Sequence, residues 1–216
     1  MNIEQARFNM VEQQIRIWEV LDQNVLDLLF VVRREEFVPA AHRLLAFADL
    51  ELPLGGGATM WSPKMEARVL QELELASGES VLEIGTGSGY LSALLAGMGA
   101  RVTSVEIDPL LSAEAGIKLQ RVGFGGVELQ VGDGSHGWGG ATYDAIVLTG
   151  STPVLPDGFV RQLNPGGRIF AVIGEAPAMS ARLIRWSAPA SLAERTLFET
   201  VIPPLINAPV PAHFEF

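Results

Sequence analysis

The segment from Val81 to Tyr90 constrains the fold more than any other part of this chain. Its apolar residues predict a strand that includes Glu83 and runs directly into Gly85, Gly87 and Gly89. Glycines at this spacing let the backbone turn tightly and approach a ligand closely. The apolar stretch that follows predicts a helix whose free N–H groups point at the same ligand. The segment therefore predicts a strand, a nucleotide-cofactor loop and a helix, in that order.

The residues in and beside this loop narrow the class of cofactor. The loop lacks the Lys-Ser/Thr ending with which triphosphate-binding loops hold phosphate and magnesium, and this argues against ATP and GTP. Its third glycine comes one position earlier than in the dinucleotide-binding fingerprint. Glu83, at the end of the strand, would repel a pyrophosphate but suits the ammonium group of an amino acid. The sequence favours a cofactor without phosphates.

Two further acidic residues fall at the ends of the next strands. Glu106 closes the strand 101–106, where an acidic side chain can accept hydrogen bonds from both hydroxyls of a ribose. Asp133 lies in a Gly-Asp-Gly turn after the third strand, where it could meet an adenine edge. A ribose without phosphates and with an amino-acid end describes S-adenosylmethionine, which we expect as the cofactor. The alternative is an ordinary strand, turn and helix, in which the carboxylates are merely solvated.

Strands and helices alternate from Ser80 onward. The expected strands are 80–84, 101–106, 127–131, 143–149, 167–174, 181–187 and 194–201, and the expected helices lie near 89–98, 109–121 and 157–163. This alternation is typical of an α/β fold, here a Rossmann-like, mostly parallel sheet of seven strands with helices on both faces. The last two strands are separated by a short loop containing Pro189. They should form an antiparallel hairpin at the edge of the sheet.

The first 79 residues are expected to form a helical extension on the substrate side of the sheet. The expected apolar faces comprise Phe8, Val11 and Ile15, then Leu21, Val25, Leu28, Leu29 and Val32, then Met65, Val69, Leu70 and Leu73. Asp22 and Ser62 are the predicted N-caps of the second and third helices, and Pro63 follows Ser62 at the first helical position. The charged run 33–36 is expected to be a solvated helix end. The glycine-rich loop 52–57 has the freedom to fold over a ligand.

The chain is expected to form a single domain. A chain of 216 residues with 48% apolar residues can bury one substantial core. Within it we expect the extension 1–79, a cofactor-binding core 80–201 and an extended tail 202–216. Prolines keep this tail from forming a regular element, so it should cover another part of the molecule; they are Pro203, Pro204, Pro209 and Pro211.

Composition excludes several functional classes. The chain has no cysteine, and His42, His136 and His213 show no ligand spacing, so we expect no metal site. No apolar run is long enough to span a bilayer and the first residues do not read as a signal peptide, which favours a cytoplasmic protein without membrane partners. A net charge of −10 argues against a nucleic-acid substrate. The sequence gives no indication of oligomeric state.

The shortage of histidines also bears on the chemistry. Methyl transfer to a carboxylate needs no general base, because a carboxylate is already ionised at neutral pH. Enzymes that methylate adenine or cytosine usually carry an Asn/Asp-Pro-Pro-aromatic loop or a Pro-Cys pair after the fourth strand. This chain has Thr149-Gly150-Ser151-Thr152-Pro153 instead. If the acceptor is a carboxylate, the shortage of histidines is therefore no objection to a methyltransferase.

Motifs over nearly the whole chain resemble the protein-L-isoaspartate O-methyltransferases. The matching segments are Met10-Val11 with Gln14-Ile15, Arg34 to Pro39, Leu52 to Gly55, Val81 to Tyr90, Gly132-Asp133-Gly134, Tyr143 to Val147, and Leu163 to Arg168. The resemblance implies an S-adenosylmethionine-dependent enzyme that methylates the free carboxylate of isoaspartyl residues in damaged proteins. It also implies that the substrate loop and the C-terminal tail form the peptide site.

The site residues follow from the loop and from this resemblance together. The expected cofactor-binding residues are Glu83, Gly85, Thr86, Gly87, Ser88, Gly89, Glu106, Ile107, Asp133 and Gly134. Thr59 and Ser62 are expected to clamp the acceptor. The family's substrate loop typically reads Gly-His-Gly-Gln-Thr-Ile-Ser-Gln-Pro, and in the segment 55–63 Trp61 stands at its serine position unless a gap brings Ser62 there. A methyltransferase with another acceptor, and a cofactor-binding module without repair activity, therefore remain open.

Overall fold

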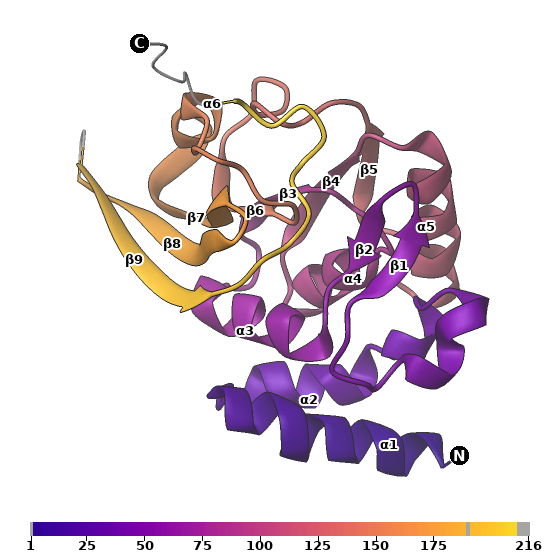
Figure 1. Ribbon diagram of the computed structural model, residues 1–216. Coiled ribbons are helices and arrows are strands. Elements are labelled where there is room, and N and C mark those ends of the chain that lie inside the picture. The colour runs from indigo at the N-terminus through magenta and orange to yellow at the C-terminus, as the bar shows by residue number, and fades with distance from the viewer. Residues whose placement is uncertain (1, 189–190, 211–216) are drawn as a thin grey trace.

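The computed structural model describes residues 2–188 and 191–210. At its centre lies a seven-stranded sheet in the order β5-β4-β3-β6-β7-β8-β9, in which the first five are parallel and β8 is antiparallel to both of its neighbours (Figure 1). The strands are β3 (Ser80–Ile84), β4 (Arg101–Glu106), β5 (Glu128–Val131), β6 (Tyr143–Leu148), β7 (Leu163–Glu175), β8 (Ala178–Ala188) and β9 (Ser191–Glu199). The predicted fold class is confirmed.

The antiparallel part of the sheet is larger than the sequence predicts. β8 and β9 form the predicted hairpin, whose Pro189 lies outside the described residues. β7 also pairs antiparallel with β8, from Arg168 to Glu175. The strands that the apolar runs predict are shorter than the observed ones. In the structure, backbone pairing continues into polar residues that carry no strand signal of their own.

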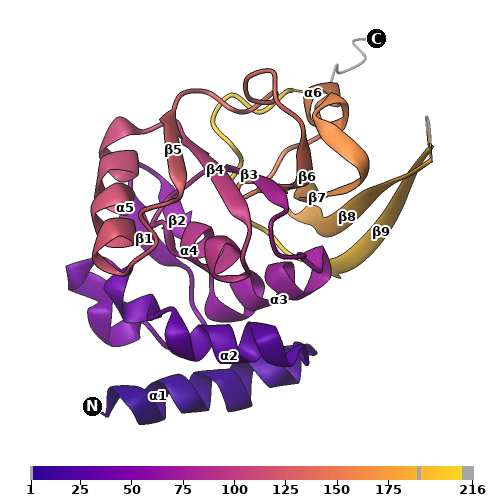
Figure 2. The same cartoon turned by 180° about the vertical axis from the view of Figure 1, so that it is seen from behind.

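Alternate residues of each strand point to opposite faces of the sheet. Val81 belongs to the larger apolar cluster and Leu82 to the smaller one on the other face. The larger cluster lies under α3 (Pro63–Leu73), α4 (Tyr90–Gly97) and α5 (Pro109–Arg121), with α1 (Ile3–Met10) and α2 (Gln23–Val31) outside them, whereas α6 (Asp157–Arg161) packs on β7 on the other face (Figures 1 and 2). Helices on both faces were predicted, and this is confirmed.

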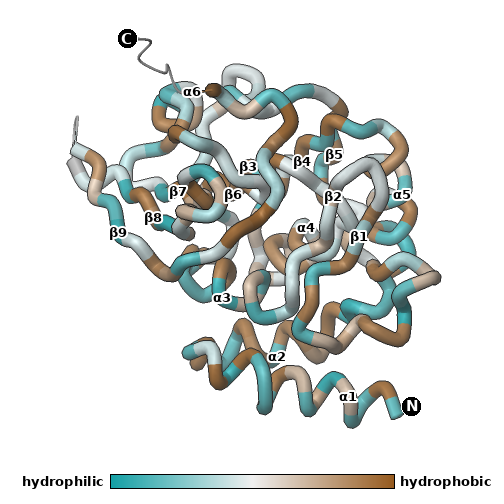
Figure 3. The backbone as a smooth tube through the Cα atoms, in the orientation of Figure 1, coloured by the Kyte–Doolittle hydropathy of each residue, from teal (hydrophilic) through white to brown (hydrophobic). Residues whose placement is uncertain are grey.

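The N-terminal helices share the larger cluster with the sheet. Asp22 caps α2 as predicted, because its side chain accepts a hydrogen bond of 2.8 Å from Asn24 N. Two residues predicted to be buried are exposed instead, Phe8 at 50% and Leu21 at 68%. Phe8 is exposed because the chain enters a π-helical turn after α1, Val11–Ile15, so the regular helical period used for the prediction does not hold. Leu21 is exposed because it precedes α2 and is not part of its buried face. The outermost helix α1 carries both hydrophobic and hydrophilic residues (Figure 3).

The charged run 33–36 is not the solvated helix end that the sequence predicts. Arg34 and Glu35 are buried in a short 3-10 helix, Arg34–Glu36, and each forms an ion pair with a residue far along the chain. Arg7 pairs with Glu35, and Arg34 pairs with Glu66 of α3. The extension also contains two further 3-10 helices, Arg16–Trp18 and Ala40–Leu45, and two short antiparallel strands, β1 (Leu52–Gly55) and β2 (Ala58–Met60).

The start of α3 differs from its prediction in one respect. Pro63 occupies the first helical position as predicted, and Ser62 has the extended backbone of an N-cap. The Ser62 side chain, however, makes no capping hydrogen bond. The predicted apolar face of this helix is buried: Met65, Val69, Leu70 and Leu73.

The tail runs back across the sheet after β9, as Figure 1 shows in yellow. Ser151 holds it in place, because Ser151 N donates to Pro203 O, Leu205 N donates to Ser151 O and Ser151 Oγ donates to Ile202 O. The tail therefore covers the loop that follows β6. Pro211 lies outside the described residues. Among the described residues, no helix is both long and apolar enough to cross a membrane.

Candidate active site

A cavity of about 350 Å³ opens at the carboxyl ends of β3, β4 and β6. In open α/β sheets this edge is where ligands bind. The loops that follow β3, β4, β5 and β6 form one side of the cavity, and the tail and the small sheet of β1 (Leu52–Gly55) and β2 (Ala58–Met60) form the other. Nine of the ten predicted cofactor residues line it: Glu83, Gly85, Thr86, Gly87, Ser88, Glu106, Ile107, Asp133 and Gly134.

Different structural constraints require glycine at Gly85, Gly87 and Gly89. All three have positive φ, which non-glycine residues rarely adopt. At Gly85 an added Cβ would lie 2.1 Å from Thr149 Oγ1, and the Thr149 hydroxyl is held by the carbonyls of Ile84 at 2.9 Å and Gly85 at 2.8 Å. Gly89 does not line the cavity, and its added Cβ would lie 3.1 Å from Cβ of Ala115 in α5. Gly89 thus allows two helices to pack.

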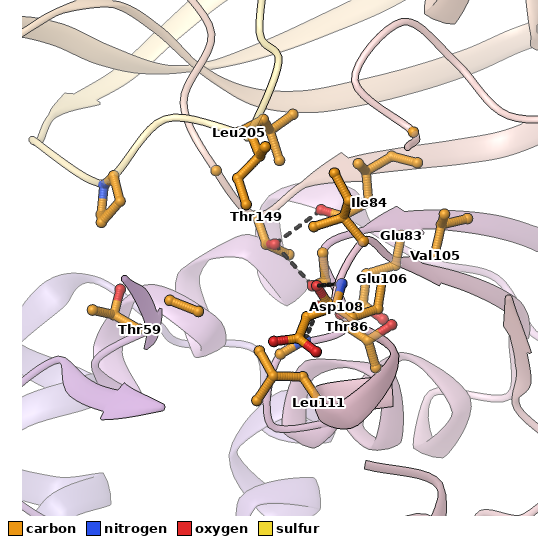
Figure 4. Close-up of a pocket in the computed structure, with 18 of the residues that line it drawn as sticks. Thr59, Glu83, Ile84, Thr86, Val105, Glu106, Asp108, Leu111, Thr149 and Leu205 are labelled. Atoms are coloured by element: carbon orange, nitrogen blue, oxygen red, sulfur yellow. Dashed lines mark hydrogen bonds between the residues drawn. The ribbon is translucent and has the colours of Figure 1, made fainter. Parts of the chain in front are cut away.

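Glu106 connects two of the loops. Its Oε2 accepts a hydrogen bond of 2.8 Å from Gly87 N, and its Oε1 accepts one of 3.1 Å from Asp108 N. The side chain is buried at the end of β4. Figure 4 shows Glu106 beside Thr86 and Asp108, with the acidic groups on the side of the pocket away from Thr59. The carboxylate is therefore held in a fixed orientation beside the glycine loop.

Glu83 is fully buried and only half satisfied. Its Oε2 accepts hydrogen bonds from Ser92 Oγ at 2.5 Å and Ser104 Oγ at 2.7 Å, whereas its Oε1 has no hydrogen-bond partner. Burial raises the pKa of this carboxyl to about 7, against the two serine hydrogen bonds. A buried acceptor without a donor is rare in folded proteins and suggests a ligand.

Asp133 joins the third loop to the tail. Its Oδ1 accepts a hydrogen bond of 2.9 Å from Ser135 N, and its Oδ2 accepts one of 2.9 Å from Asn207 Nδ2. These bonds stabilise the ionised form and hold the pKa of Asp133 below its usual value, with the Ser135 backbone contributing most. The tail thereby reaches the cofactor side of the cavity.

The two predicted acceptor residues are not brought together. Thr59 of β2 lines the cavity, and its hydroxyl makes one long contact of 3.5 Å with Glu51. Ser62 does not line it. Trp61 lines it only in part, because its ring packs edge-on against Phe170 in the core with a centroid distance of 6.0 Å.

Every charged residue that lines the cavity within the described part of the chain is acidic. These residues are Glu66, Glu83, Glu106, Asp108 and Asp133. A cavity surrounded by carboxylates attracts a cation and repels phosphate. The lining therefore suits a positively charged ligand.

Sequence reasoning missed several lining residues. Asp108 follows β4, and Thr149 and Gly150 follow β6, so these three lie at or just beyond a predicted strand end, whereas Leu111 lies in α5. The position of these three residues at the end of a strand is the sequence signal that could have identified them. Glu66 carried no such signal, because it reaches the cavity only through long-range packing. The tail residues 203–206 also line the cavity, and the family resemblance had pointed to the tail as part of the peptide site.

Comparisons with known proteins point to one family. A family-level sequence model described as protein-L-isoaspartate(D-aspartate) O-methyltransferase matches residues 5–207. A protein-L-isoaspartate O-methyltransferase 1 of Rhodopseudomonas palustris is 43% identical over 83% of this chain and 73% of its own length. A protein-L-isoaspartate O-methyltransferase of Aeropyrum pernix is 40% identical over 94% of this chain and 80% of its own length.

Solved structures share the fold. One, provisionally assigned as a protein-L-isoaspartate O-methyltransferase of Plasmodium falciparum in complex with S-adenosyl-L-homocysteine, has a TM-score of 0.79 at 19% identity and covers 92% of this chain and 97% of that one. Another, described as a protein-L-isoaspartate O-methyltransferase, has a TM-score of 0.77 at 25% identity and covers 94% of this chain and 65% of that one.

Proposed function

The chain belongs to the protein-L-isoaspartate(D-aspartate) O-methyltransferase family, and from this premise we propose what its cavity does. The enzyme transfers a methyl group from S-adenosylmethionine to the free carboxylate of isoaspartyl residues in damaged proteins. The observation that carries this proposal is a cavity bordered by the glycine loop, whose charged lining residues in the described part of the chain are all acidic and include Glu83 with its unpartnered oxygen.

The residues of the cavity fit this cofactor. S-adenosylmethionine supplies, when bound, a methyl group on a positively charged sulfonium, together with an ammonium group and a ribose. The carboxylates around the cavity favour that positive charge. Glu83 Oε1 is an acceptor without a donor, which suits the ammonium group, and Glu106 is oriented to accept from the ribose hydroxyls. Asp133, which lines the cavity after β5, is the residue that we assign to the adenine.

The acceptor side has to position a carboxylate and exclude water. Thr59 offers a hydroxyl to the incoming carboxylate, which needs no general base because it is already ionised. The tail residues 203–206, apolar in character, close the cavity over the same side, so that water is kept from the reacting groups. The shared apolar cluster supports treating 1–79, the core 80–201 and the tail as one methyltransferase domain.

The direct test measures methyl transfer from labelled S-adenosylmethionine to an isoaspartyl peptide, with the matched aspartyl peptide as control. We expect selective labelling of the isoaspartyl peptide, with Trp61 tolerated in the loop. Calorimetric binding of the cofactor without labelling of either peptide would refute the repair function. Restoring the family's loop at 56–62 would then separate the alternatives: recovered labelling indicates a diverted acceptor, and continued inactivity favours a binding module.

Thr59 and Ser62 should differ sharply when they are replaced. Thr59→Val keeps the shape of the side chain but removes the hydroxyl, so we expect the KM for the isoaspartyl peptide to rise about tenfold with an unchanged Kd for the cofactor. Ser62→Ala is the matched control, and we expect its KM to change less than about twofold because Ser62 lies outside the lining. Steady-state kinetics of both variants would show the contrast. An equal rise in KM for both variants would contradict this assignment.

Glu83 should make cofactor binding depend on pH. Its pKa is raised to about 7 in the ligand-free protein, and the ammonium group prefers the ionised form. Binding therefore releases a proton below that pKa, and the Kd should fall several-fold as the pH rises from about 6 to about 7.5. Calorimetry in two buffers of different ionisation enthalpy measures the released proton directly. In Glu83→Gln the pH dependence should disappear, and its persistence would exclude Glu83 as the source.

We also propose that the protein acts in the cytoplasm on isoaspartyl-containing proteins and not on nucleic acid. The support is compositional: a chain without cysteine suits a reducing compartment, and a net charge of −10 disfavours polyanions. Salt-sensitive binding of RNA to the purified protein would contradict the second statement.

A further inference from the structure

Two buried serines hold Glu83 from outside the cavity. Ser104 lies opposite Glu83 in the pairing of β3 with β4, and Ser92 lies on α4. Both hydroxyls donate to Glu83 Oε2, Ser92 at 2.5 Å and Ser104 at 2.7 Å, and the two hydroxyl oxygens are 3.5 Å apart. Both serines are fully buried, and neither of them lines the cavity.

A third hydroxyl joins this cluster from the cofactor loop. Thr86 Oγ1 lies 2.7 Å from Ser104 Oγ. Ser104 has a single hydroxyl proton, which it donates to Glu83, so Thr86 is the donor in this contact. Thr86 lines the cavity on the same side as Glu83 (Figure 4). The hydrogen bonds therefore couple the position of the loop to the orientation of the buried carboxyl.

The two oxygens of Glu83 are left in different situations. Oε2 accepts both serine hydroxyls, whereas Oε1 has no partner although the residue lines the cavity. Any rotation that moves the carboxyl out of this orientation lengthens two hydrogen bonds to a charged acceptor. Oε1 is thus the oxygen that remains for a donor group of a ligand.

The other groups around Glu83 do not favour its ionised form. Burial is the largest cause of its raised pKa, and the charge of Glu106 on β4 adds to it. Glu66 of α3 has a pKa raised by burial to about 8 despite its pairing with Arg34, so it is mostly protonated near neutral pH. The neighbour of Glu83 on β6 is the apolar Val147. Against these effects, the two serine hydrogen bonds lower the pKa of Glu83.

We propose that Ser92 and Ser104 are positioning residues for the cofactor: they fix the Glu83 carboxyl so that Oε1 accepts from the ammonium group of S-adenosylmethionine. Both serines act through Glu83, because neither of them lines the cavity. The inference rests on the proposed function, and within that function only on the binding of the cofactor.

Alanine variants of the two serines test this role through the pH dependence of cofactor binding. Ser92→Ala and Ser104→Ala each remove one donor to the carboxylate, so we expect the pKa of Glu83 to rise by about one unit. The Kd for S-adenosylmethionine should then exceed the wild-type Kd about five- to tenfold at pH 6.5, and stay within about twofold of it at pH 8.5. Both proteins are titrated at the same pH, so ionisation of the ligand itself cancels in this ratio.

Two controls accompany these variants. Ser112 is buried in α5 and does not line the cavity, so Ser112→Ala should bind the cofactor like the wild type at both pH values. In the Glu83→Gln background, position 83 no longer titrates. There the Ser92→Ala and Ser104→Ala substitutions should change the Kd by the same factor at both pH values.

A purely structural role would give a different pattern. The Kd of the two variants would then rise by similar factors at pH 6.5 and pH 8.5 while the thermal midpoint falls, and this result would overturn the proposal. Should one variant not fold, the other still decides, because the two serines lie on different elements. Titration of the Glu83 carboxyl by carbon-13 NMR in the ligand-free variants is a second readout, and a pKa equal to the wild-type value would contradict the proposal.

The failure of this inference can be distinguished from the failure of the proposed function. A wild-type protein that binds the cofactor but labels no isoaspartyl peptide would refute the repair function alone. Kd ratios that do not depend on pH, in a wild-type background that labels the peptide, would refute the role of the serines alone.

Discussion

Replacing Gly85 with alanine is expected to weaken S-adenosylmethionine binding by at least about 100-fold. The new Cβ would lie 2.1 Å from Thr149 Oγ1, and two backbone carbonyls hold that hydroxyl in place. The φ of +97° at this position adds strain for any residue with a side chain. Both effects move the loop that has to approach the cofactor. Isothermal titration calorimetry measures the loss, and the thermal midpoint of the ligand-free protein should fall by a few degrees as well.

Two further variants separate the clash from the backbone strain. Gly123 has a similar φ of +90° but no atom within 4 Å of an added Cβ, so Gly123→Ala should carry the strain without the loss of binding. Thr149→Ala in the Gly85→Ala background removes the nearest atom and should recover part of the affinity that Gly85→Ala alone loses. Unchanged cofactor binding in Gly85→Ala would show that the loop does not approach the ligand.

Glu106→Gln is the second substitution for which we expect a large effect. The carboxylate accepts from Gly87 N and Asp108 N through different oxygens, so an amide would turn an N–H donor toward one of these N–H groups. The variant would also lose the charge-assisted bonds that we propose between Glu106 and the ribose hydroxyls. Each such bond contributes about 1.5–3 kcal/mol, so the Kd for the cofactor should rise about 100-fold or more.

The measurement for Glu106→Gln is again the calorimetric Kd. Glu128→Gln provides the matched control, because Glu128 is an exposed acid on the neighbouring strand and does not line the cavity. Its Kd should equal that of the wild type. A Glu106→Gln protein that folds and binds the cofactor with near-normal affinity would rule out Glu106 as the ribose ligand.

The strand-end loops that line the cavity could be predicted from the sequence because their determinants are local. Gly85, Glu106 and Asp133 each follow a recognisable strand, and the ends of parallel strands meet at one edge of the sheet. The role of Gly89 in helix packing could not be predicted from the local sequence, because the residue it packs against, Ala115 of α5, is 26 positions away. The strand alternation was sufficient to predict the sheet.

The remaining features depend on contacts across long distances in the sequence. Arg34 and Glu35 look like a solvated run because their partners Glu66 and Arg7 lie 32 and 28 positions away. The hydrogen bond between Asn207 and Asp133 spans 74 positions, so no local pattern predicts that the tail reaches the loop after β5. Ser62 shows the converse: a sequence pattern typical of a cap, whose hydroxyl makes no capping bond in the fold.

The half-satisfied Glu83 has a consequence for the lifetime of the protein. A buried carboxyl with a raised pKa destabilises the ligand-free fold near neutral pH, and a bound cation removes that penalty. Occupied molecules should therefore resist thermal unfolding and proteolysis better than empty ones. The abundance of this enzyme in a cell would then follow the supply of its methyl donor, without any separate regulatory element.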